Sequence, residues 1–243
     1  MYIYGAKYAH GDKDISAGIY FRTASDNYDD DGDLDIYCNG NISALVEGDT
    51  TAPNCFASLF HGDLSLMSAP DLSSIEAIGQ SGFYSMFYNC KSLKEATDLS
   101  SLKIVEESSC CQMFYFCKSL TTAPDMSSVE SIKVSGCYNM FNECPQLEYA
   151  PDMPMLREIG PTGCYCMFQN CSSLLYPPAM PVLETIGNTG CNTMFDSCSS
   201  LVCPIDMPNI NTIDANGCEI MYFNCYSLNV DTNENPSKKL TKK

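Results

Sequence analysis

The chain has 243 residues, a formal net charge of −17 and an isoelectric point near 4.2. Nucleic acids and anionic lipid surfaces are bound through concentrated lysine and arginine, so this acidity argues against both kinds of partner. No apolar run of about 18 residues or more occurs, so we expect no direct membrane insertion.

The first predicted segment, residues 1–54, lacks the repeat that fills the rest of the chain. Alternating apolar and aromatic stretches at Tyr2–Tyr4, Ile19–Phe21 and Leu34–Tyr37 predict a few β-strands. Terminal units of a repeat array must cover its core, so we expect this segment to be a small β-rich cap.

An acidic turn inside the cap resembles the start of a calcium-binding loop. Its oxygen-bearing side chains are Asn27, Asp29, Asp31, Asp33 and Asp35. Gly32 occupies the sixth place, as in an EF-hand, but the twelfth place is Cys38 instead of glutamate. No helical flanks are evident, so we expect an acidic surface turn, with calcium as the weaker alternative and no cofactor.

A repeat with a period of 27 residues follows the cap, marked by Leu66, Leu93, Leu120, Leu147, Leu174, Leu201 and Leu228. Leucines recurring at about 20 to 29 residues are typical of leucine-rich repeats, in which one unit cannot bury its apolar face without neighbours. The sequence therefore predicts a solenoid over residues 55–228. It consists of a half-unit at 55–65 and six full units at 66–92, 93–119, 120–146, 147–173, 174–200 and 201–227.

Each unit divides into two halves with different patterns. The first half, as in Leu120–Met126, is too rich in proline for a helix and predicts the single strand of the coil. Val129 and Ile132 then predict a second extended piece. Cys137, Met140, Phe141 and Cys144 follow at i, i+3, i+4 and i+7, which predicts a helical turn. The expected fold class is an α/β repeat solenoid of stacked coils, each with a short strand and a helical turn.

The last 15 residues, 229–243, abandon the repeat and include Lys238, Lys239, Lys242 and Lys243. We expect this lysine-rich tail to be disordered.

Most of the 16 cysteines occupy two places in the unit. The inner cysteine column is Cys110, Cys137, Cys164, Cys191 and Cys218, and the outer cysteine column is Cys90, Cys117, Cys144, Cys171, Cys198 and Cys225. Seven residues span about 10 Å of helix, beyond the roughly 4.4–6.8 Å of bridged Cα atoms, so bridges within a unit are not expected. We expect a ladder of buried free thiols, with at most a few bridges between coils.

The cysteines outside this ladder are the places to look for a disulfide or a reactive thiol. They are Cys38, Cys55, Cys111, Cys166 and Cys203. No C-x-x-C pair occurs, so no metal site is expected among the cysteines.

An acidic column recurs at one place in the units: Asp71, Asp98, Asp125, Asp152 and Asp206, with Ala179 as the exception. The first interpretation is that each aspartate accepts hydrogen bonds from the turn that follows it. The alternative is a rail of carboxylates that binds a cation or a ligand.

The chain offers little for catalysis. Its histidines are His10 and His61, and it has no tryptophan, no phosphate-binding glycine loop and no nucleophile elbow. Buried cysteines are inert, so we expect a protein that is not an enzyme.

If the strand side binds a partner, variable residues just after the repeating leucine are the predicted contact stripe. These are Met67, Lys94, Thr121, Glu148, Leu175 and Val202, with Tyr149 and Tyr176 beside them. Tyrosines offer large, rigid contact areas. The alternative is that Leu175 and Val202 only cover the edge of the core.

The pattern C-Y-x-M-F-x-x-C-x-x-L-x-x-A-P-x-M in Cys137–Met153 resembles the BspA-like leucine-rich repeat proteins of Bacteroidetes and related gut organisms. The resemblance covers roughly residues 34–228, including the lead-in Ile36–Leu45. Departures are Thr97 in place of proline, Phe83 in place of the first cysteine, and Ile205 after an early Pro204.

This resemblance implies a surface or secreted adhesion protein that binds a host or bacterial protein. The start of the chain has no basic, apolar leader pattern, so phage-borne and cytoplasmic locations stay as alternatives. Two other functions also stay open: a structural or receptor-recognition part of a larger assembly, and a carbohydrate or calcium-dependent ligand binder. The sequence does not set the oligomeric state.

Overall fold

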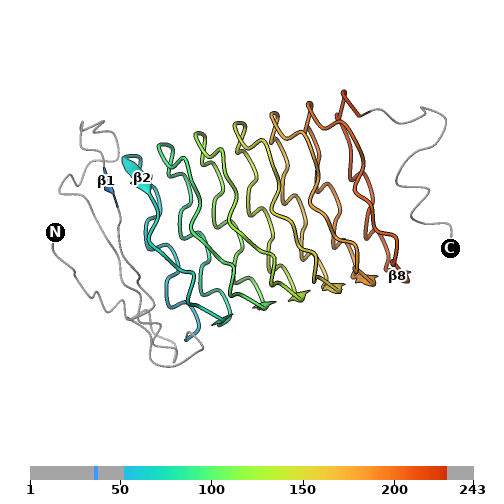
Figure 1. Ribbon diagram of the computed structural model, residues 1–243, viewed down its shortest axis with the longest axis horizontal. Helices are drawn as coiled ribbons and strands as arrows, with labels where there is room; N and C mark the ends of the chain where they lie inside the picture. The colour runs from blue at the N-terminus through green and yellow to red at the C-terminus, as the bar shows by residue number, and fades with distance from the viewer. Residues whose placement is uncertain (1–35, 38–51, 229–243) are drawn as a thin grey trace, which may run out of the picture.

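The computed structural model describes residues 36–37 and 52–228. In this part, successive coils lie side by side from the N-terminal to the C-terminal end and form an elongated repeat solenoid (Figure 1). Most of the predicted cap, the calcium candidate between Asn27 and Asp35, and the predicted tail lie outside the described residues.

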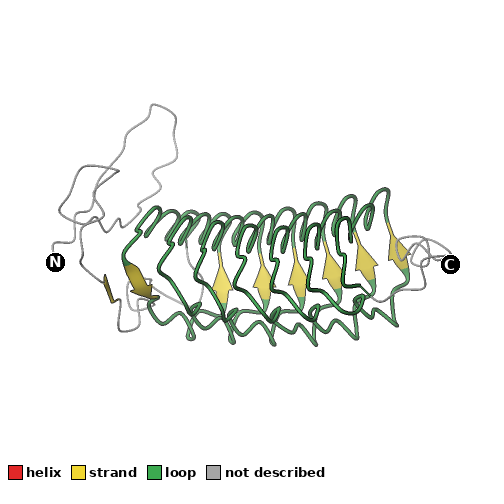
Figure 2. Cartoon of the chain, turned by 90° about the horizontal axis from the view of Figure 1, so that it is seen from above, coloured by secondary structure: helices red, strands yellow, loops and turns green. Residues whose placement is uncertain are grey.

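The main sheet has six parallel strands in the order β3-β4-β5-β6-β7-β8, each contributed by one coil (Figure 2). The strands are β3 (Ala77–Ile78), β4 (Ile104–Val105), β5 (Ser131–Ile132), β6 (Glu158–Ile159), β7 (Thr185–Ile186) and β8 (Thr212–Ile213). Neighbours pair in register, so that Ile132 lies opposite Ile159 and Ile159 opposite Ile186. These β-branched side chains suit a strand and are fully buried, which fixes the register.

The main strand predicted in the first half of each unit was wrong, whereas the second extended piece predicted around Val129 and Ile132 is confirmed, because it contains β5. The first half contributes β2 (Leu66–Ser68), which pairs with β1 (Ile36–Tyr37). In later coils it contributes only isolated parallel bridges, here called the bridge ladder: Glu95 to Thr122, Thr122 to Tyr149, and Tyr149 to Tyr176. Pro124 and Pro151 stand two residues after bridge residues and have no N–H group, so the ladder cannot extend into a sheet.

The predicted helical turn was also wrong, because no helix forms in the described part of the chain. The segment is instead a ribbon of overlapping tight turns, here called the turn ribbon. Every second N–H bonds within the coil, as from Met140 to the Cys137 carbonyl at 3.1 Å. The N–H groups between them bond to the next coil, as from Phe141 to the Met167 carbonyl at 2.9 Å.

Every fourth residue of the turn ribbon has a positive φ, which an α-helix does not allow. In one coil these are Ser135, Asn139 and Glu143, with φ of 53°, 54° and 64°. A positive φ at the third residue of a turn defines the type II geometry, so type II turns alternate with other turns along the ribbon. The four-residue repeat of this ribbon turns the same apolar side chains inward as a helix would.

Aromatic rings form a continuous row through the core, as expected when coils of equal length stack in register. The row consists of Phe60, Phe87, Phe114, Phe141, Phe168, Phe195 and Tyr222. Adjacent ring centroids are 5.3 to 5.6 Å apart and adjacent planes lie within 9° of each other. Equivalent side chains of consecutive coils therefore lie on top of one another along the whole stack.

Both cysteine columns lie beside this row. The inner column is at most 3% exposed, and the outer column is buried except for Cys225, which is half-buried. Each outer thiol donates to the backbone carbonyl of a phenylalanine in the preceding coil, at 2.9 to 3.1 Å. The cysteines of the described residues are free thiols, including the off-ladder Cys55, Cys111, Cys166 and Cys203.

Candidate functional site

The predicted contact stripe lies along the bridge ladder, and the structure brings its residues into one row. The Thr121 N–H bonds to the Lys94 carbonyl at 2.9 Å, and the Leu175 N–H bonds to the Glu148 carbonyl at 3.0 Å. The Val202 N–H continues this row to the Leu175 carbonyl at 3.1 Å. We call this row the ladder face: Met67, Lys94, Thr121, Glu148, Tyr149, Leu175, Tyr176 and Val202.

Two tyrosines form the largest exposed feature of the ladder face. Tyr149 and Tyr176 are 57% and 51% exposed, although both belong to the hydrogen-bonded ladder. Their rings stack at a centroid distance of 6.4 Å and an angle of 18°. Val202, from the next coil, is 38% exposed, and Leu175 is half-buried. Leu175 therefore fits the alternative role of covering the edge of the core. Val202 is more exposed and fits that role less well.

At the N-terminal end of the acidic column, the aspartates accept hydrogen bonds from the turns that follow them. Asp71, Asp98 and Asp125 each accept a hydrogen bond from the backbone N–H two residues later, at 2.8, 2.7 and 2.8 Å. Hydrogen bonds from the Ser73 side chain and backbone lower the pKa of Asp71. Asp152 instead accepts from the Ala179 N–H of the next coil, at 2.8 Å. Ala179, the exception in the column, therefore supplies a partner for the aspartate before it.

A second exposed surface, which the sequence reasoning missed, lies at the main sheet. The residue before each strand alternates in charge along the stack: Glu76, Lys103, Glu130, Arg157 and Glu184. Lys103 pairs with Glu76 at 3.8 Å, and Arg157 pairs with Glu184 at 2.9 Å. These side chains are roughly half exposed, so each pair contributes little to stability.

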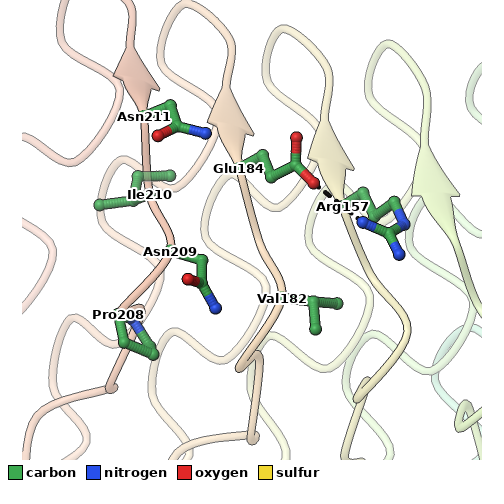
Figure 3. Close-up of a pocket in the computed structure, with 7 residues that line it drawn as sticks. All are labelled: Arg157, Val182, Glu184, Pro208, Asn209, Ile210 and Asn211. Carbon is green, nitrogen blue, oxygen red and sulfur yellow. Dashed lines mark hydrogen bonds and ion pairs between the residues drawn. The ribbon is translucent and has the colours of Figure 1, made fainter.

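A hollow opens on this sheet face where the charge alternation ends. It is lined by Arg157, Val182, Glu184 and the run Pro208–Asn211, which come from three consecutive coils (Figure 3). The only ion pair drawn across it joins Arg157 to Glu184. This pair joins the two charges of the hollow to each other, and the Asn209 side-chain amide donates to the Pro181 carbonyl at 2.6 Å. The alternating charges 27 residues apart were the signal in the sequence that could have revealed this surface.

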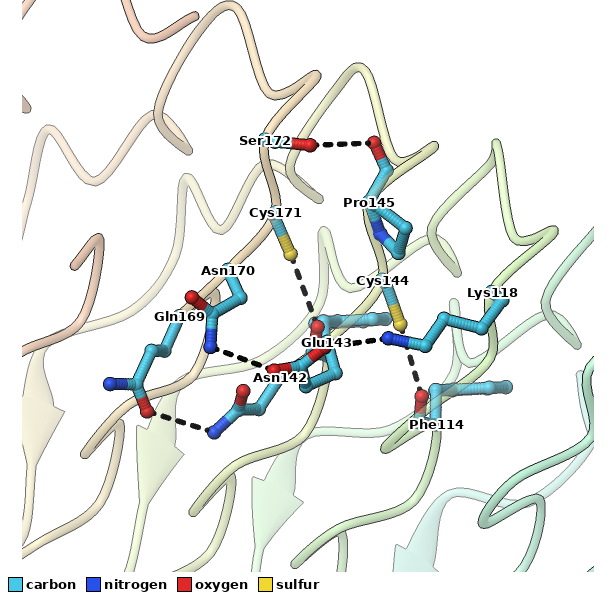
Figure 4. A network of polar contacts seen from close by, with 11 residues as sticks. Phe114, Lys118, Asn142, Glu143, Cys144, Pro145, Gln169, Asn170, Cys171 and Ser172 are labelled. Carbon is cyan, nitrogen blue, oxygen red and sulfur yellow. Dashed lines mark hydrogen bonds and ion pairs between the residues drawn. The ribbon is translucent and has the colours of Figure 1, made fainter. Parts of the chain in front are cut away.

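On the turn ribbon, a polar network connects neighbouring coils (Figure 4). The Lys118 ammonium contacts the Glu143 carboxylate at 2.6 Å, and the Asn170 amide donates to the same carboxylate at 3.0 Å. Nearby, the Asn142 amide donates to the Gln169 carbonyl oxygen at 3.0 Å. These groups are used in contacts between coils, which indicates a structural role for this network.

The described residues contain no group of three histidine, cysteine, aspartate or glutamate side chains that could hold a metal ion. His61 stacks on Tyr88 with ring centroids 4.5 Å apart, and its burial lowers its pKa. Burial raises the pKa of the Cys117 and Cys171 thiols to about 12, which disfavours the reactive thiolate. His10 lies outside the described residues.

No protein-family model matches this sequence, and no curated protein matches it. Among solved structures, a leucine-rich repeat protein from Bacteroides ovatus ATCC 8483 is similar, with a TM-score of 0.53 and 20% identity. A leucine rich cell surface protein from Faecalibacterium prausnitzii A2-165 gives a TM-score of 0.52 and 19% identity. Each similarity covers 93% of this chain, but only 50% and 54% of the respective solved chains.

These similarities establish the fold: the chain forms a leucine-rich repeat solenoid. It spans about half the length of these two solved structures. No helix in residues 36–37 and 52–228 is long and apolar enough to cross a membrane.

Proposed function

We propose that this protein is a non-catalytic, protein-binding solenoid of the BspA-like kind, which acts in adhesion at a bacterial surface or after secretion. The observation that carries the proposal is the ladder face. It holds two stacked, exposed tyrosines on a backbone that hydrogen bonds fix from coil to coil. Large aromatic side chains on a rigid support are the usual energetic centres of protein interfaces.

The sequence resemblance and the solved structures together support the proposed location and partner class. One of the similar structures is described as a cell surface protein, which supports a surface location for this chain. A host or bacterial protein is the partner that we expect. Catalysis has no support from the described residues, because their buried thiols are protonated and their one described histidine is stacked on a tyrosine.

The test is binding of the purified protein to intact host epithelial cells and to neighbouring gut bacteria, measured by flow cytometry. Tyr149→Ala combined with Tyr176→Ala should reduce the bound fraction about tenfold or more, since each ring is an exposed anchor. Tyr84→Ala combined with Tyr226→Ala removes two exposed tyrosines from other surfaces and should leave binding unchanged. Equal binding by both double variants would contradict the assignment of the ladder face.

A further inference from the structure

Carboxylates lie on the N-terminal side of the tyrosine pair of the ladder face. Glu148 directly precedes Tyr149, and Asp152 follows three residues later, within about 10 Å of chain. The preceding coil adds the exposed side chain of Asp125, and the coil before it adds those of Glu95 and Asp98. Adjacent strands of a ladder are about 4.8 Å apart, so these like charges repeat at close spacing along the edge of the face.

The negative charge of this face is not compensated within the described residues. Their four ion pairs use Glu76, Glu143, Glu158 and Glu184, which lie on the sheet face and the turn ribbon. Among the eight residues of the ladder face, Lys94 and Glu148 carry opposite charges, so the excess negative charge comes from Asp98, Asp125 and Asp152 beside the face. Charges of one sign that gather on one surface create a potential that attracts a partner of opposite sign.

The aromatic centre and the acidic edge together suit one side chain in particular. The guanidinium group of arginine stacks on tyrosine rings and also binds carboxylates through two parallel hydrogen bonds. In an extended peptide, side chains on the same side are about 6.6 Å apart, because each residue advances about 3.3 Å. The rings of Tyr149 and Tyr176 are 6.4 Å apart, which matches this spacing.

We propose that the ladder face docks an extended, cationic segment of its partner protein, which runs along the stack of Tyr149 and Tyr176 with arginines at alternating positions beside the two rings. The carboxylates of Glu148 and Asp152 bind the guanidinium groups at the edge of the rings. This inference rests on the proposed protein-binding function and names the chemistry of the segment that is recognised.

The test uses a fluorescent peptide, Gly-Ser-Arg-Ser-Arg-Ser-Arg-Ser-Gly, titrated with the full chain at about 50 mM salt and followed by fluorescence anisotropy. We expect saturable binding, and at least about tenfold weaker binding of the peptide in which citrulline replaces arginine. A peptide with its three arginines adjacent should also bind more weakly, because it presents only part of its charge to one side.

Two protein variants separate this site from general attraction to an acidic protein. Glu148→Gln combined with Asp152→Asn removes two charges but keeps the amide oxygen that can accept from Ala179, and should weaken peptide binding about tenfold. Glu106→Gln combined with Glu107→Gln makes the same charge change at two exposed residues after β4, and should leave binding unchanged. Equal weakening by both variants, or no preference for arginine over citrulline, would overturn the inference.

Failure of this inference is distinguishable from failure of the proposed function. If the arginine peptide does not bind but cell binding still depends on Tyr149 and Tyr176, the cationic partner is excluded and the binding face stands. If neither cell binding nor peptide binding depends on the two tyrosines, both proposals fall.

Discussion

The cysteine that ends each turn ribbon is a hydrogen-bond donor as well as a core side chain. The Phe114 carbonyl accepts the Cys117 N–H within the coil at 3.1 Å and the Cys144 thiol of the next coil at 3.1 Å. A carbonyl oxygen has two lone pairs, so the thiol satisfies the second one in a place that water does not reach. An aliphatic residue of similar size would fill the space, but it would leave one lone pair of the Phe114 carbonyl oxygen without a hydrogen-bond donor.

Removing one outer thiol should therefore cost more than the loss of its volume alone. Cys144→Ala is expected to lower the free energy of unfolding by about 1–3 kcal/mol, through a small cavity and a lost hydrogen bond. Cys144→Ser keeps a donor and should lose less. Urea unfolding measures both, with the half-buried Cys203→Ala as the control, expected within about 0.5 kcal/mol of wild type. A Cys144→Ala loss no larger than the control's would contradict this role of the thiol.

Burial of the thiols also predicts how stability depends on pH. Burial raises the pKa of Cys110, Cys117 and Cys171 from 9.0 to about 12. Above pH 9 the unfolded chain releases these protons while the folded chain keeps them, so the unfolded state gains stability. The contribution of these thiols to the free energy of unfolding should be constant below pH 9. It should fall as the pH rises from 9 toward 12. Urea midpoints at pH 8 and pH 10.5 measure the loss, and Cys117→Val should make it smaller.

At the scale of the element, the sequence pattern predicted the repeat but did not distinguish two backbone conformations. The period, the inward-facing residues and the aromatic row all follow from side-chain spacing, which the leucines and phenylalanines define. The helix prediction failed because a turn ribbon with a four-residue repeat buries nearly the same positions as a helix with 3.6 residues per turn. A signal was present in the polar residues four apart, such as Ser135, Asn139 and Glu143, since asparagine tolerates positive φ.

The candidate site was likewise predicted only in part from the sequence. The stripe on the bridge ladder could be predicted, because residues one period apart become neighbours whatever the backbone conformation. The sheet face around Arg157 and Glu184 was not predicted, because the main sheet was expected in the proline-containing half of the unit and the alternating charges were not considered. Proline excludes a sheet interior as well as a helix, and only the second of these effects entered the prediction.

The positive φ values of the turn ribbon predict one stabilising substitution. Ile220 has a φ of 46°, and it is 54% exposed, so a β-branched residue is held in a strained conformation with little burial in return. Ile220→Asn should raise the free energy of unfolding by about 1 kcal/mol. Ile220→Val keeps the branching and should leave it unchanged, so identical urea midpoints for the two variants would contradict the strain.

At the scale of the whole molecule, every interface between coils repeats one set of contacts. Five N–H groups of each described turn ribbon except the last bond to carbonyls of the next coil. In the fourth ribbon the donors are Ser135, Cys137, Asn139, Phe141 and Glu143, and the acceptors are Pro161, Gly163, Tyr165, Met167 and Gln169. Because each coil contacts its neighbours alone, stability is a sum of unit terms and interface terms.

The central claim is that equivalent residues stack in register at a period of 27, so that whole coils are interchangeable. Urea unfolding of a variant that lacks residues 147–173 tests it most directly, with a variant lacking residues 147–160 as the out-of-register control. The first deletion joins Phe141 to Phe195 in the aromatic row, and we expect a cooperative transition with a lower midpoint and a smaller denaturant dependence. If this variant loses its cooperative transition as the control does, the coils are not equivalent stacked units and the claim is wrong.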